Sequence, residues 1–294
     1  RPVIMTPNTL GDRQASRQTL DRKIGTIGYH VAGPEGAPWL LLLHGSGPGV
    51  TGWANYQGNL PVFAEHYRCV IMDFPGYGNS DLVDGDAIEG CLGAALDLLN
   101  ALAIERCHML GNSLGGIVGS HIAARHPERV ISFATIGGIG LNLFSAFPGE
   151  GLNLLTAFAE EPSRERVEQW LRSMVFDQAL VTEALIEQRF QQAIEPKTLA
   201  ATRQLYSRQA ISAITEMRRQ QPTKALEHLP LITAPTLITW GRDDRVSPMD
   251  IALMPMRFIP NAQLHVFPNC GHWAMIECKQ AFEALVLAFF QQHH

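Results

Sequence analysis

The chain has 294 residues, of which 46% are hydrophobic and 17% are charged, and its formal net charge is −5. This composition is typical of a globular protein that is long enough to bury a large core. The acidic balance, with no basic stretch, argues against nucleic acid and anionic membranes as partners.

The sequence also predicts a compartment. Five cysteines are an odd number and form no Cys-x-x-Cys pair, so we expect them to be reduced in a cytoplasmic protein. The N-terminal stretch from Arg1 to Leu20 is polar and has no apolar signal core. The longest apolar run, Trp39 to Leu43, is too short to span a bilayer, so we expect no membrane segment.

Short apolar runs alternate with helical patterns along most of the chain. This alternation predicts an α/β fold with a mainly parallel, twisted sheet and helices on both of its faces. Ala87–Ala103 has apolar residues at steps of three and four and is predicted to be a helix, as is the closing stretch Gln280–Phe290. The predicted strands are Thr26–Ala32, Trp39–His44, Cys69–Asp73, Cys107–Leu110, Val130–Ile136, Thr236–Trp240 and Gln263–Phe267.

Residues 141–221 interrupt this alternation. They contain no convincing strand, and their periodicity predicts helices over Ser163–Val175, Thr182–Ile194 and Thr198–Arg219. Prolines at 222, 230 and 235 mark the return to the sheet. We therefore expect an all-helical lid over residues 141–221, inserted into a core built from residues 1–140 and 222–294.

A nucleophile motif stands at the end of the strand predicted at 107–110. The stretch Gly111-Asn112-Ser113-Leu114-Gly115 is G-x-S-x-G at a strand-to-helix junction. The turn is so tight that larger side chains beside it would collide, which explains the two glycines. Its strain lifts the hydroxyl of Ser113 out of the sheet, beside the positive end of the next helix. We predict that Ser113 is a nucleophile.

A nucleophilic serine needs a base, and the base needs an orienting carboxylate. Asp243 and Asp244 follow the strand at 236–240, and His272 follows the strand at 263–267. We predict that Asp244 and His272 complete the triad, while Asp243 serves the turn or bonds a neighbouring arginine. The alternative is that His272 is a loop histidine that caps the end of a helix. A metal site at Cys270 and His272 fits no common zinc spacing, so we expect no metal.

The third requirement is an oxyanion hole. The glycine-rich loop from His44 to Gly49 follows the strand at 39–43, and its backbone amides can point into a cleft. We assign one donor to the amide of Leu114, at the start of the helix after the nucleophile. The second donor is assigned to the amide of Ser46, with Gly47 as the alternative.

Together these stretches resemble the α/β-hydrolase superfamily over nearly the whole chain, and most closely the meta-cleavage product hydrolases, which hydrolyse carbon–carbon bonds. The nucleophile motif is common to the superfamily. The Gly-Pro-Gly loop with the following Trp-x-Asn, and Cys-Gly-His-Trp, are much narrower signals. The matching stretches are His44–Gly49, Gly52–Asn55, Asp73–Ser80, Gly111–Gly116, Trp240–Arg245 and Leu264–Trp273.

The resemblance implies a substrate and a reaction. The substrate class is a 2-hydroxy-6-oxohexa-2,4-dienoate, cleaved without a cofactor to 2-hydroxypenta-2,4-dienoate and a carboxylic acid during aromatic degradation. Ser113 would attack the 6-carbonyl or activate water, and these two routes stay open. A homo-oligomer, a dimer or larger, is also implied. The expected substrate-binding residues are Gly45, Gly47, Asn55, Asn112, Arg189 and Trp273.

Arg189 is also singled out by its position on a helix. Val181, Leu185 and Arg189 are four residues apart, so the guanidinium lies on an apolar stripe where it would be partly desolvated and would need an anion. The alternatives are that it extends past the stripe to water or pairs with Glu183, Glu187 or Asp177.

Two other functions use the same motifs. A carboxylesterase has the same triad, and a small-molecule receptor can keep the hydrolase fold. The substituent on the dienoate is not defined by the motifs, because lid and pocket side chains determine it. The aromatic and methionine candidates are Phe144, Phe147, Met174, Phe176 and Phe190, and the alternative for each is a position in the core of the lid.

Overall fold

The structure is a computed structural model that describes residues 17–294. The predicted polar N-terminus therefore lies outside the described residues, apart from Arg17–Leu20. These four residues form β1, an exposed edge strand that the sequence analysis did not predict. It pairs antiparallel with β2 (Ile27–Ala32), which supplies the backbone hydrogen bonds that the short polar segment cannot make alone.

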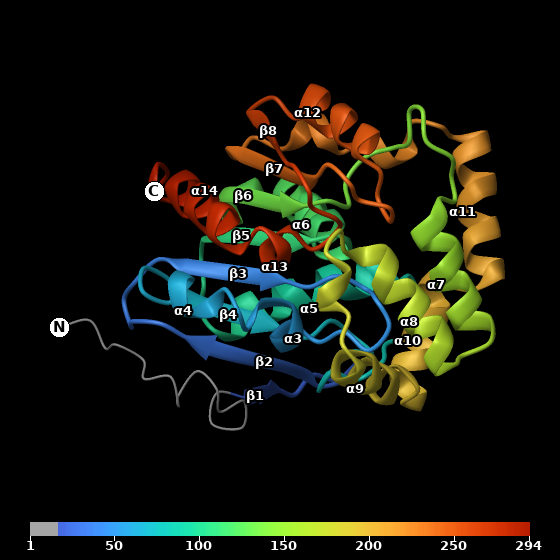
Figure 1. The fold of residues 1–294 in the computed structure, drawn as a ribbon. Coiled ribbons are helices and arrows are strands. Elements are labelled where there is room, and N and C mark those ends of the chain that lie inside the picture. Colours follow the sequence, from blue (N-terminus) through green and yellow to red (C-terminus); the bar gives the residue numbers. More distant parts are fainter. Residues whose placement is uncertain (1–16) are drawn as a thin grey trace.

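Eight strands form one sheet, in the order β1-β2-β4-β3-β5-β6-β7-β8 (Figure 1). β2 pairs antiparallel with β4, and the strands from β4 to β8 pair parallel, which confirms the predicted mainly parallel sheet. The remaining strands are β3 (Trp39–Leu43), β4 (Arg68–Met72), β5 (Cys107–Asn112), β6 (Val130–Ile136), β7 (Thr236–Gly241) and β8 (Ala262–Phe267).

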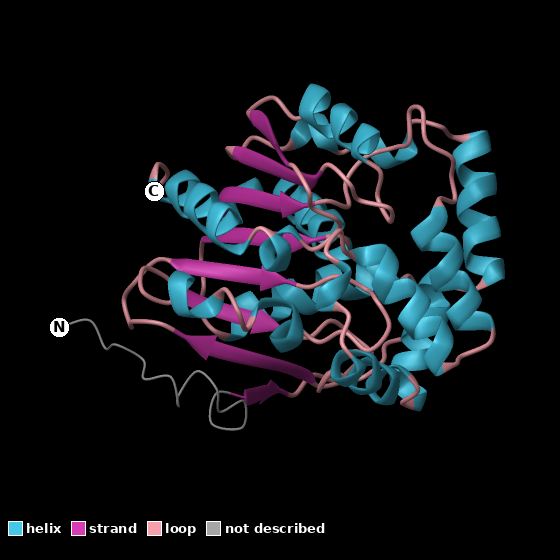
Figure 2. Cartoon of the chain, in the orientation of Figure 1, coloured by secondary structure: helices cyan, strands magenta, loops and turns pink. Residues whose placement is uncertain are grey.

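Helices cover both faces of the sheet (Figure 2). The alternation along β3 shows how. Leu41 and Leu43 pack with the helices α5 (Ala87–Ala101) and α6 (Leu114–Arg125), whereas Leu40 and Leu42 pack with the helices of the opposite face. α12 (Leu253–Phe258) packs on the first face. The second face carries α3 (Gly52–Tyr56), α4 (Leu60–Phe63), α13 (Ala274–Glu277) and α14 (Lys279–Gln291).

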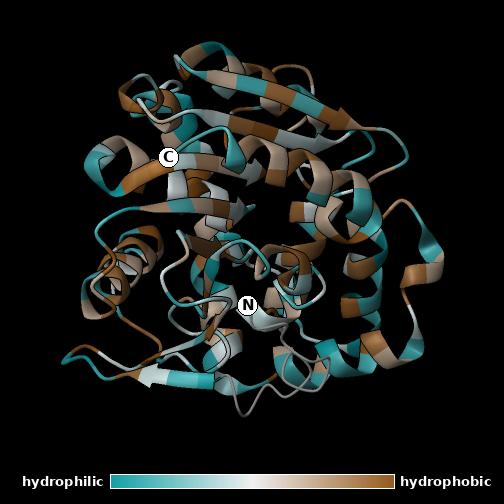
Figure 3. Ribbon diagram, turned by 90° about the vertical axis from the view of Figure 1, so that its left-hand side faces the viewer, coloured by the Kyte–Doolittle hydropathy of each residue, from teal (hydrophilic) through white to brown (hydrophobic). Residues whose placement is uncertain are grey.

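Five helices form a separate layer beyond the sheet edge to which the arrows of β3, β5 and β6 point (Figure 1). We call it the helical layer: α7 (Glu150–Glu160), α8 (Arg164–Met174), α9 (Glu183–Ala193), α10 (Pro196–Tyr206) and α11 (Arg208–Gln220). Figure 3 views the molecule from the side opposite this layer and shows hydrophilic and hydrophobic residues interspersed along the elements nearest the viewer, as expected where one side of an element is buried. Within the described residues no strand lies between β6 and β7. The function of this layer as a lid stays a prediction.

The helical layer corrects one prediction and adds one helix. The helix predicted over Thr198–Arg219 is two helices, because Ser207 has extended backbone and caps α11 by accepting a hydrogen bond from Ala210 N at 3.1 Å. α7 lies within the segment predicted to be all-helical, but the sequence analysis gave it no bounds. In residues 17–294 we found no helix with the length and the apolar run that are needed to cross a membrane.

Candidate active site

Ser113 occupies a strained turn between β5 and α6. Its φ and ψ angles are 51° and −112°, in a region that only a constrained turn imposes on a residue with a side chain. A Cβ on Gly111 would lie 2.3 Å from the carbonyl oxygen of Gly115, and one on Gly115 would lie 2.2 Å from that of Leu43. The structure thus gives the physical reason for both glycines of the motif.

Asp244 and His272 are joined by a hydrogen bond. Nδ1 of His272 lies 2.6 Å from Oδ2 of Asp244, and both side chains are buried. The other carboxylate oxygen of Asp244 accepts hydrogen bonds from the amides of Val246 and Ser247, each at 2.8 Å. These two amides orient the carboxylate, which leaves Oδ2 to hold the imidazole with its proton on Nδ1.

Asp243, the neighbouring acid, does not reach the histidine. Its Oδ2 accepts a hydrogen bond from the amide of Cys270 at 3.2 Å, and its carboxylate also pairs with Arg242 at 3.4 Å. The structure therefore places Asp243 in the turn and against the arginine, and Asp244 against His272.

Ser113 and His272 line the same cavity, of about 190 Å³, between the sheet edge and the helical layer. Among residues 17–294 the His272 ring has one hydrogen bond, that to Asp244, so Nε2 remains available on the cavity side. The backbone amide of His272 donates to the carbonyl oxygen of Met174 in α8 at 2.8 Å, which ties the histidine to the helical layer. The structure thus brings together all three predicted members of the triad.

Three backbone amides of the cavity wall are candidates for the predicted oxyanion hole. Leu114 is the first residue of α6, so its amide has no acceptor within the helix. Among the described residues, the amides of Ser46 and Gly47 also find no acceptor, whereas the amide of Gly45 lies 3.5 Å from Oδ1 of Asn55. Ser46, Gly47 and Leu114 all line the cavity, so the choice between the two loop amides stays a prediction.

Tyr206 is a site residue that the sequence analysis missed. It ends α10, lines the cavity and forms a short hydrogen bond between its hydroxyl and Oγ of Ser46. The hydroxyl of Tyr77 donates to the carbonyl oxygen of Ser46 at 3.4 Å. These contacts clamp the loop that carries the second oxyanion candidate. No sequence motif contains Tyr206, and its part depends on how α10 packs over the loop.

His44, at the start of the same loop, is a structural histidine. Its Nε2 accepts a hydrogen bond from the amide of Phe74 at 2.8 Å, so the proton lies on Nδ1, which donates to the carbonyl oxygen of Gly45. The ring is fully buried, and this desolvation lowers its pKa to about 4. It is therefore neutral at pH 7.

Arg189 lies in the cavity with no counter-ion. Its side chain is 6% exposed, its guanidinium stacks on the rings of Trp170 and Trp273 at 5.3 and 5.5 Å, and its Nε donates to the carbonyl oxygen of Pro48 at 2.8 Å. Among residues 17–294 it forms no ion pair, and burial lowers its pKa to about 10. The terminal nitrogens are left without an anion, which a charged ligand could supply.

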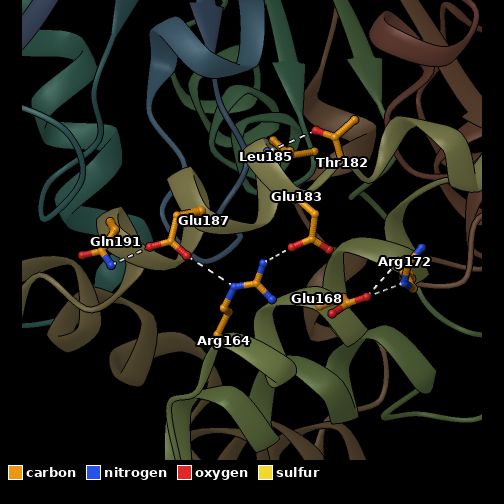
Figure 4. Close-up of polar contacts among 8 residues, drawn as sticks. All are labelled: Arg164, Glu168, Arg172, Thr182, Glu183, Leu185, Glu187 and Gln191. Carbon is orange, nitrogen blue, oxygen red and sulfur yellow. Dashed lines mark hydrogen bonds and ion pairs between the residues drawn. The ribbon is translucent and has the colours of Figure 1, made fainter.

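The acids considered as partners for Arg189 are engaged elsewhere. Glu183 and Glu187 both pair with Arg164, across the gap between α8 and α9 (Figure 4). Asp177 accepts a hydrogen bond from the amide of Ala179 at 3.0 Å and begins a short 3-10 turn. The structure thus excludes these pairings for Arg189, and its burial excludes an extension to water.

The other predicted binding residues also line the cavity, namely Gly45, Gly47, Asn55, Asn112 and Trp273. The amide nitrogen of Asn55 is buried without a hydrogen-bond partner among the described residues. That of Asn112 donates to the carbonyl oxygen of Ile136 at 3.1 Å. A Cβ on Gly47 would lie 2.2 Å from the Trp170 ring, so a residue with a side chain does not fit at this position.

The predicted substituent pocket is only partly correct. Phe147 and Met174 line the cavity, but Phe144 and Phe176 are 85% and 49% exposed, and Phe190 packs among the helices. Helical periodicity does not distinguish a side chain packed among the helices from one that lines the cavity. The wall residues that were missed include Leu152, Leu155, Leu205, Ile211, Ile214 and Arg218.

The described residues contain no cluster of three or more histidine, cysteine, aspartate or glutamate side chains that could hold a metal ion. Cys270 stays a free thiol beside the carboxyl end of β8, and burial raises its pKa. The groups in the cavity are therefore a serine hydroxyl, an imidazole–carboxylate pair, free backbone amides and a bare guanidinium. This set suits attack on a carbonyl of an anionic compound.

Comparisons with known proteins agree with this chemistry. The model of the alpha/beta hydrolase fold family matches residues 38–278. The 2-hydroxy-6-oxo-6-phenylhexa-2,4-dienoate hydrolase of Burkholderia cepacia is 38% identical, over 85% of this chain and 86% of the relative. A 2-hydroxy-6-oxononadienedioate/2-hydroxy-6-oxononatrienedioate hydrolase of Cupriavidus pinatubonensis is also 38% identical, over 86% of this chain and 87% of the relative.

A solved structure gives the same result. The meta-cleavage product hydrolase from Pseudomonas fluorescens IP01 (CumD) superposes with a TM-score of 0.82 and 31% identity, over 94% of this chain and 97% of that one. The chain therefore belongs to the α/β-hydrolase family and, within it, to the meta-cleavage product hydrolases.

Proposed function

We propose that the protein hydrolyses the C5–C6 bond of a 2-hydroxy-6-oxohexa-2,4-dienoate, with Ser113, His272 and Asp244 as its catalytic triad. The observation that carries this proposal is the buried, unpaired guanidinium of Arg189 in the same cavity as Ser113. An esterase for neutral substrates has no use for such a charge, whereas a dienoate presents a carboxylate to it.

The reaction needs an electron sink, and the substrate supplies one. Arg189, with Asn55 and Asn112, would hold the carboxylate and 2-hydroxyl end while the dienol ketonises, its 2-hydroxyl proton being replaced by one at C5. His272 relays these protons, and the carboxylate of Asp244 keeps its imidazole in the required tautomer.

Cleavage then takes place at the other end of the dienoate. An oxygen nucleophile, Ser113 or water that it activates, adds to C6, and the amides of Leu114 and Ser46 stabilise the oxyanion. The C5–C6 electron pair moves into the conjugated ketone, which gives 2-hydroxypenta-2,4-dienoate. The acyl carbon C6 leaves as a carboxylic acid with the oxygen of water.

The helical layer is proposed to act as a lid, because it supplies Trp170, Arg189 and Tyr206 to a cavity whose catalytic groups come from the sheet. We also propose that the protein is a cytoplasmic homo-oligomer whose partner is this small-molecule substrate, not nucleic acid or membrane. The net charge of −5 and the free cysteines support the compartment, and the family resemblance supports the assembly.

The test compares a 6-phenyl dienoate with 4-nitrophenyl butyrate, followed by absorbance. We expect the wild type to turn over the dienoate with a much higher kcat/KM, and Ser113→Ala to lower kcat by about 10⁴- to 10⁶-fold. A carboxylesterase would prefer the butyrate, and a receptor would stop after a single turnover. Either result contradicts the proposal, as does a Ser113→Ala variant that keeps a tenth of the activity.

Arg189→Gln tests the observation on which the proposal depends. Because the amide cannot replace a charged, forked donor, kcat/KM for the dienoate should fall about 100-fold, while hydrolysis of the butyrate should change little. An equal loss on both substrates would mean that Arg189 only supports the fold. Arg164→Gln, whose arginine lies outside the cavity, is the matched control.

A further inference from the structure

A second arginine, Arg218, lines the same cavity, and the proposed reaction does not use it. It belongs to the last turn of α11, and it is partly buried, which lowers its pKa. Its guanidinium lies 3.6 Å from the ring centre of Phe147, and its Nη1 donates to Oδ1 of Asn142 at 3.2 Å. Asn142 is itself fixed, because its amide donates to Ser145 and Ala146.

Arg218 also has no carboxylate partner among residues 17–294. Acids on its own helix and on the neighbouring helix α7 are engaged, since Glu216 of α11 pairs with Arg219 and Glu150 of α7 pairs with Arg245. Asp250 accepts hydrogen bonds from three successive amides of the loop 143–145, which lowers its pKa to about 2. Arg218 therefore repeats the arrangement of Arg189: an aromatic ring, one oxygen acceptor and no anion.

The two arginines lie on opposite sides of the nucleophile. Arg189 contacts Pro48, in the loop after β3, and Arg218 contacts Asn142, in the loop after β6. Ser113 follows β5, and the sheet order β3-β5-β6 places β5 between the other two strands. A dienoate whose carboxylate is held at Arg189 and whose 6-carbonyl is at Ser113 therefore extends its substituent towards Arg218.

The cavity wall also includes the apolar side chains Leu152, Ile214 and Ile251. A partly buried guanidinium without an ion pair has lost part of its hydration, and a ligand carboxylate could replace it with charge-assisted hydrogen bonds. We propose that Arg218 binds a carboxylate on the 6-substituent, so that the substrate is a diacid and the acid released from C6 is a dicarboxylic acid. This inference rests on the proposed function, and it adds the substrate's second anionic group.

The test uses two dienoates of matched size, one with a 2-carboxyethyl and one with a 2-carbamoylethyl substituent at C6. We expect the wild type to prefer the carboxylate by about tenfold or more in kcat/KM. Arg218→Gln should lower kcat/KM for the carboxylate about 10- to 100-fold, mainly through KM, and should change that for the carbamoyl compound by less than about twofold. Arg219→Gln is the matched control, because its arginine is exposed and paired.

The outcomes separate the two proposals. Equal turnover of both dienoates by the wild type overturns the inference and leaves the proposed function intact, as does an equal loss on both in Arg218→Gln. Failure of the wild type to cleave either dienoate overturns the proposed function itself. If Arg218→Gln does not fold, the preference of the wild type between the two substituents decides the question.

Discussion

The sheet edge and the helical layer meet at one cavity, but they contribute different chemistry to it. Ser113, Asp244 and His272 come from the carboxyl ends of strands and are fixed by backbone hydrogen bonds and a strained turn. Arg189 and Arg218 come from helices and are held by aromatic rings. The sheet is therefore expected to set the rate of bond breaking, and the helical layer the choice of substrate.

The largest expected effect lies on the sheet side. Asp244→Asn should lower kcat about 10⁴-fold with little change in KM, because the amide favours the wrong tautomer of His272. Asp243→Asn, next to it in sequence, is the control and should keep most of the activity, since Asp243 bonds the turn and Arg242. Steady-state kinetics on a dienoate measure both. Similar losses in the two variants would contradict the assignment of the triad acid.

A smaller effect is expected on the pH dependence of the free energy of unfolding, and it arises in the sheet-bearing part of the chain. All eleven histidines lie outside residues 150–220, so titration of histidine in acid acts on the sheet-bearing part. Burial lowers the pKa of His44 from 6.5 to about 4, so between these values the unfolded chain binds a proton that the folded chain does not. The free energy of unfolding should therefore fall as the pH falls from 6.5 to 4.

His44→Gln should make this fall shallower by up to about 3 kcal/mol, since glutamine can donate and accept in the same positions without titrating. Urea unfolding at pH 7 and pH 4.5 measures the difference. His265→Gln, at an exposed position of β8, is the control. Parallel pH profiles for the wild type and His44→Gln would show that the folded state does not suppress protonation of this ring.

The smallest expected effect belongs to the outer side of the helical layer. Arg164 pairs with Glu183 and Glu187 at the surface, where solvent screens the charges. Arg164→Gln should leave Tm within about 2 °C of the wild type and leave kcat/KM unchanged. A loss of activity as large as that of Arg189→Gln would show that the two faces of the layer are not separate in function.

The sequence predicted the sheet side well for a physical reason. Each proposed catalytic group follows a short apolar strand and stands beside glycines that a tight turn requires, so motif and position agree. β1 was missed because a polar edge segment becomes a strand only through its partner β2. The break at Ser207 was missed because a serine inside a periodic segment is compatible with a continuous helix.

The helical side was harder to predict. Arg189 could be singled out because it interrupts an apolar stripe. Tyr206 and Arg218 carry no such signal, and their importance follows from how α10 and α11 stack over the sheet edge. Phe144 and Phe176 were named as pocket candidates because they are aromatic, yet both are exposed.

The loop 45–49 packs so closely against the helical layer that a side chain on Gly47 or Gly49 would clash with it. A Cβ on Gly47 would meet the Trp170 ring at 2.2 Å, and one on Gly49 would meet the carbonyl oxygen of Arg189 at 2.5 Å. The backbone of the loop 45–49 and the indole of Trp170 therefore pack closely against each other across the boundary between the sheet-bearing part and the helical layer. A chimera that takes its helical layer from a relative inherits this fit only if residues 45–49 come from the same parent, so recombination sites that split the pair are expected to fail.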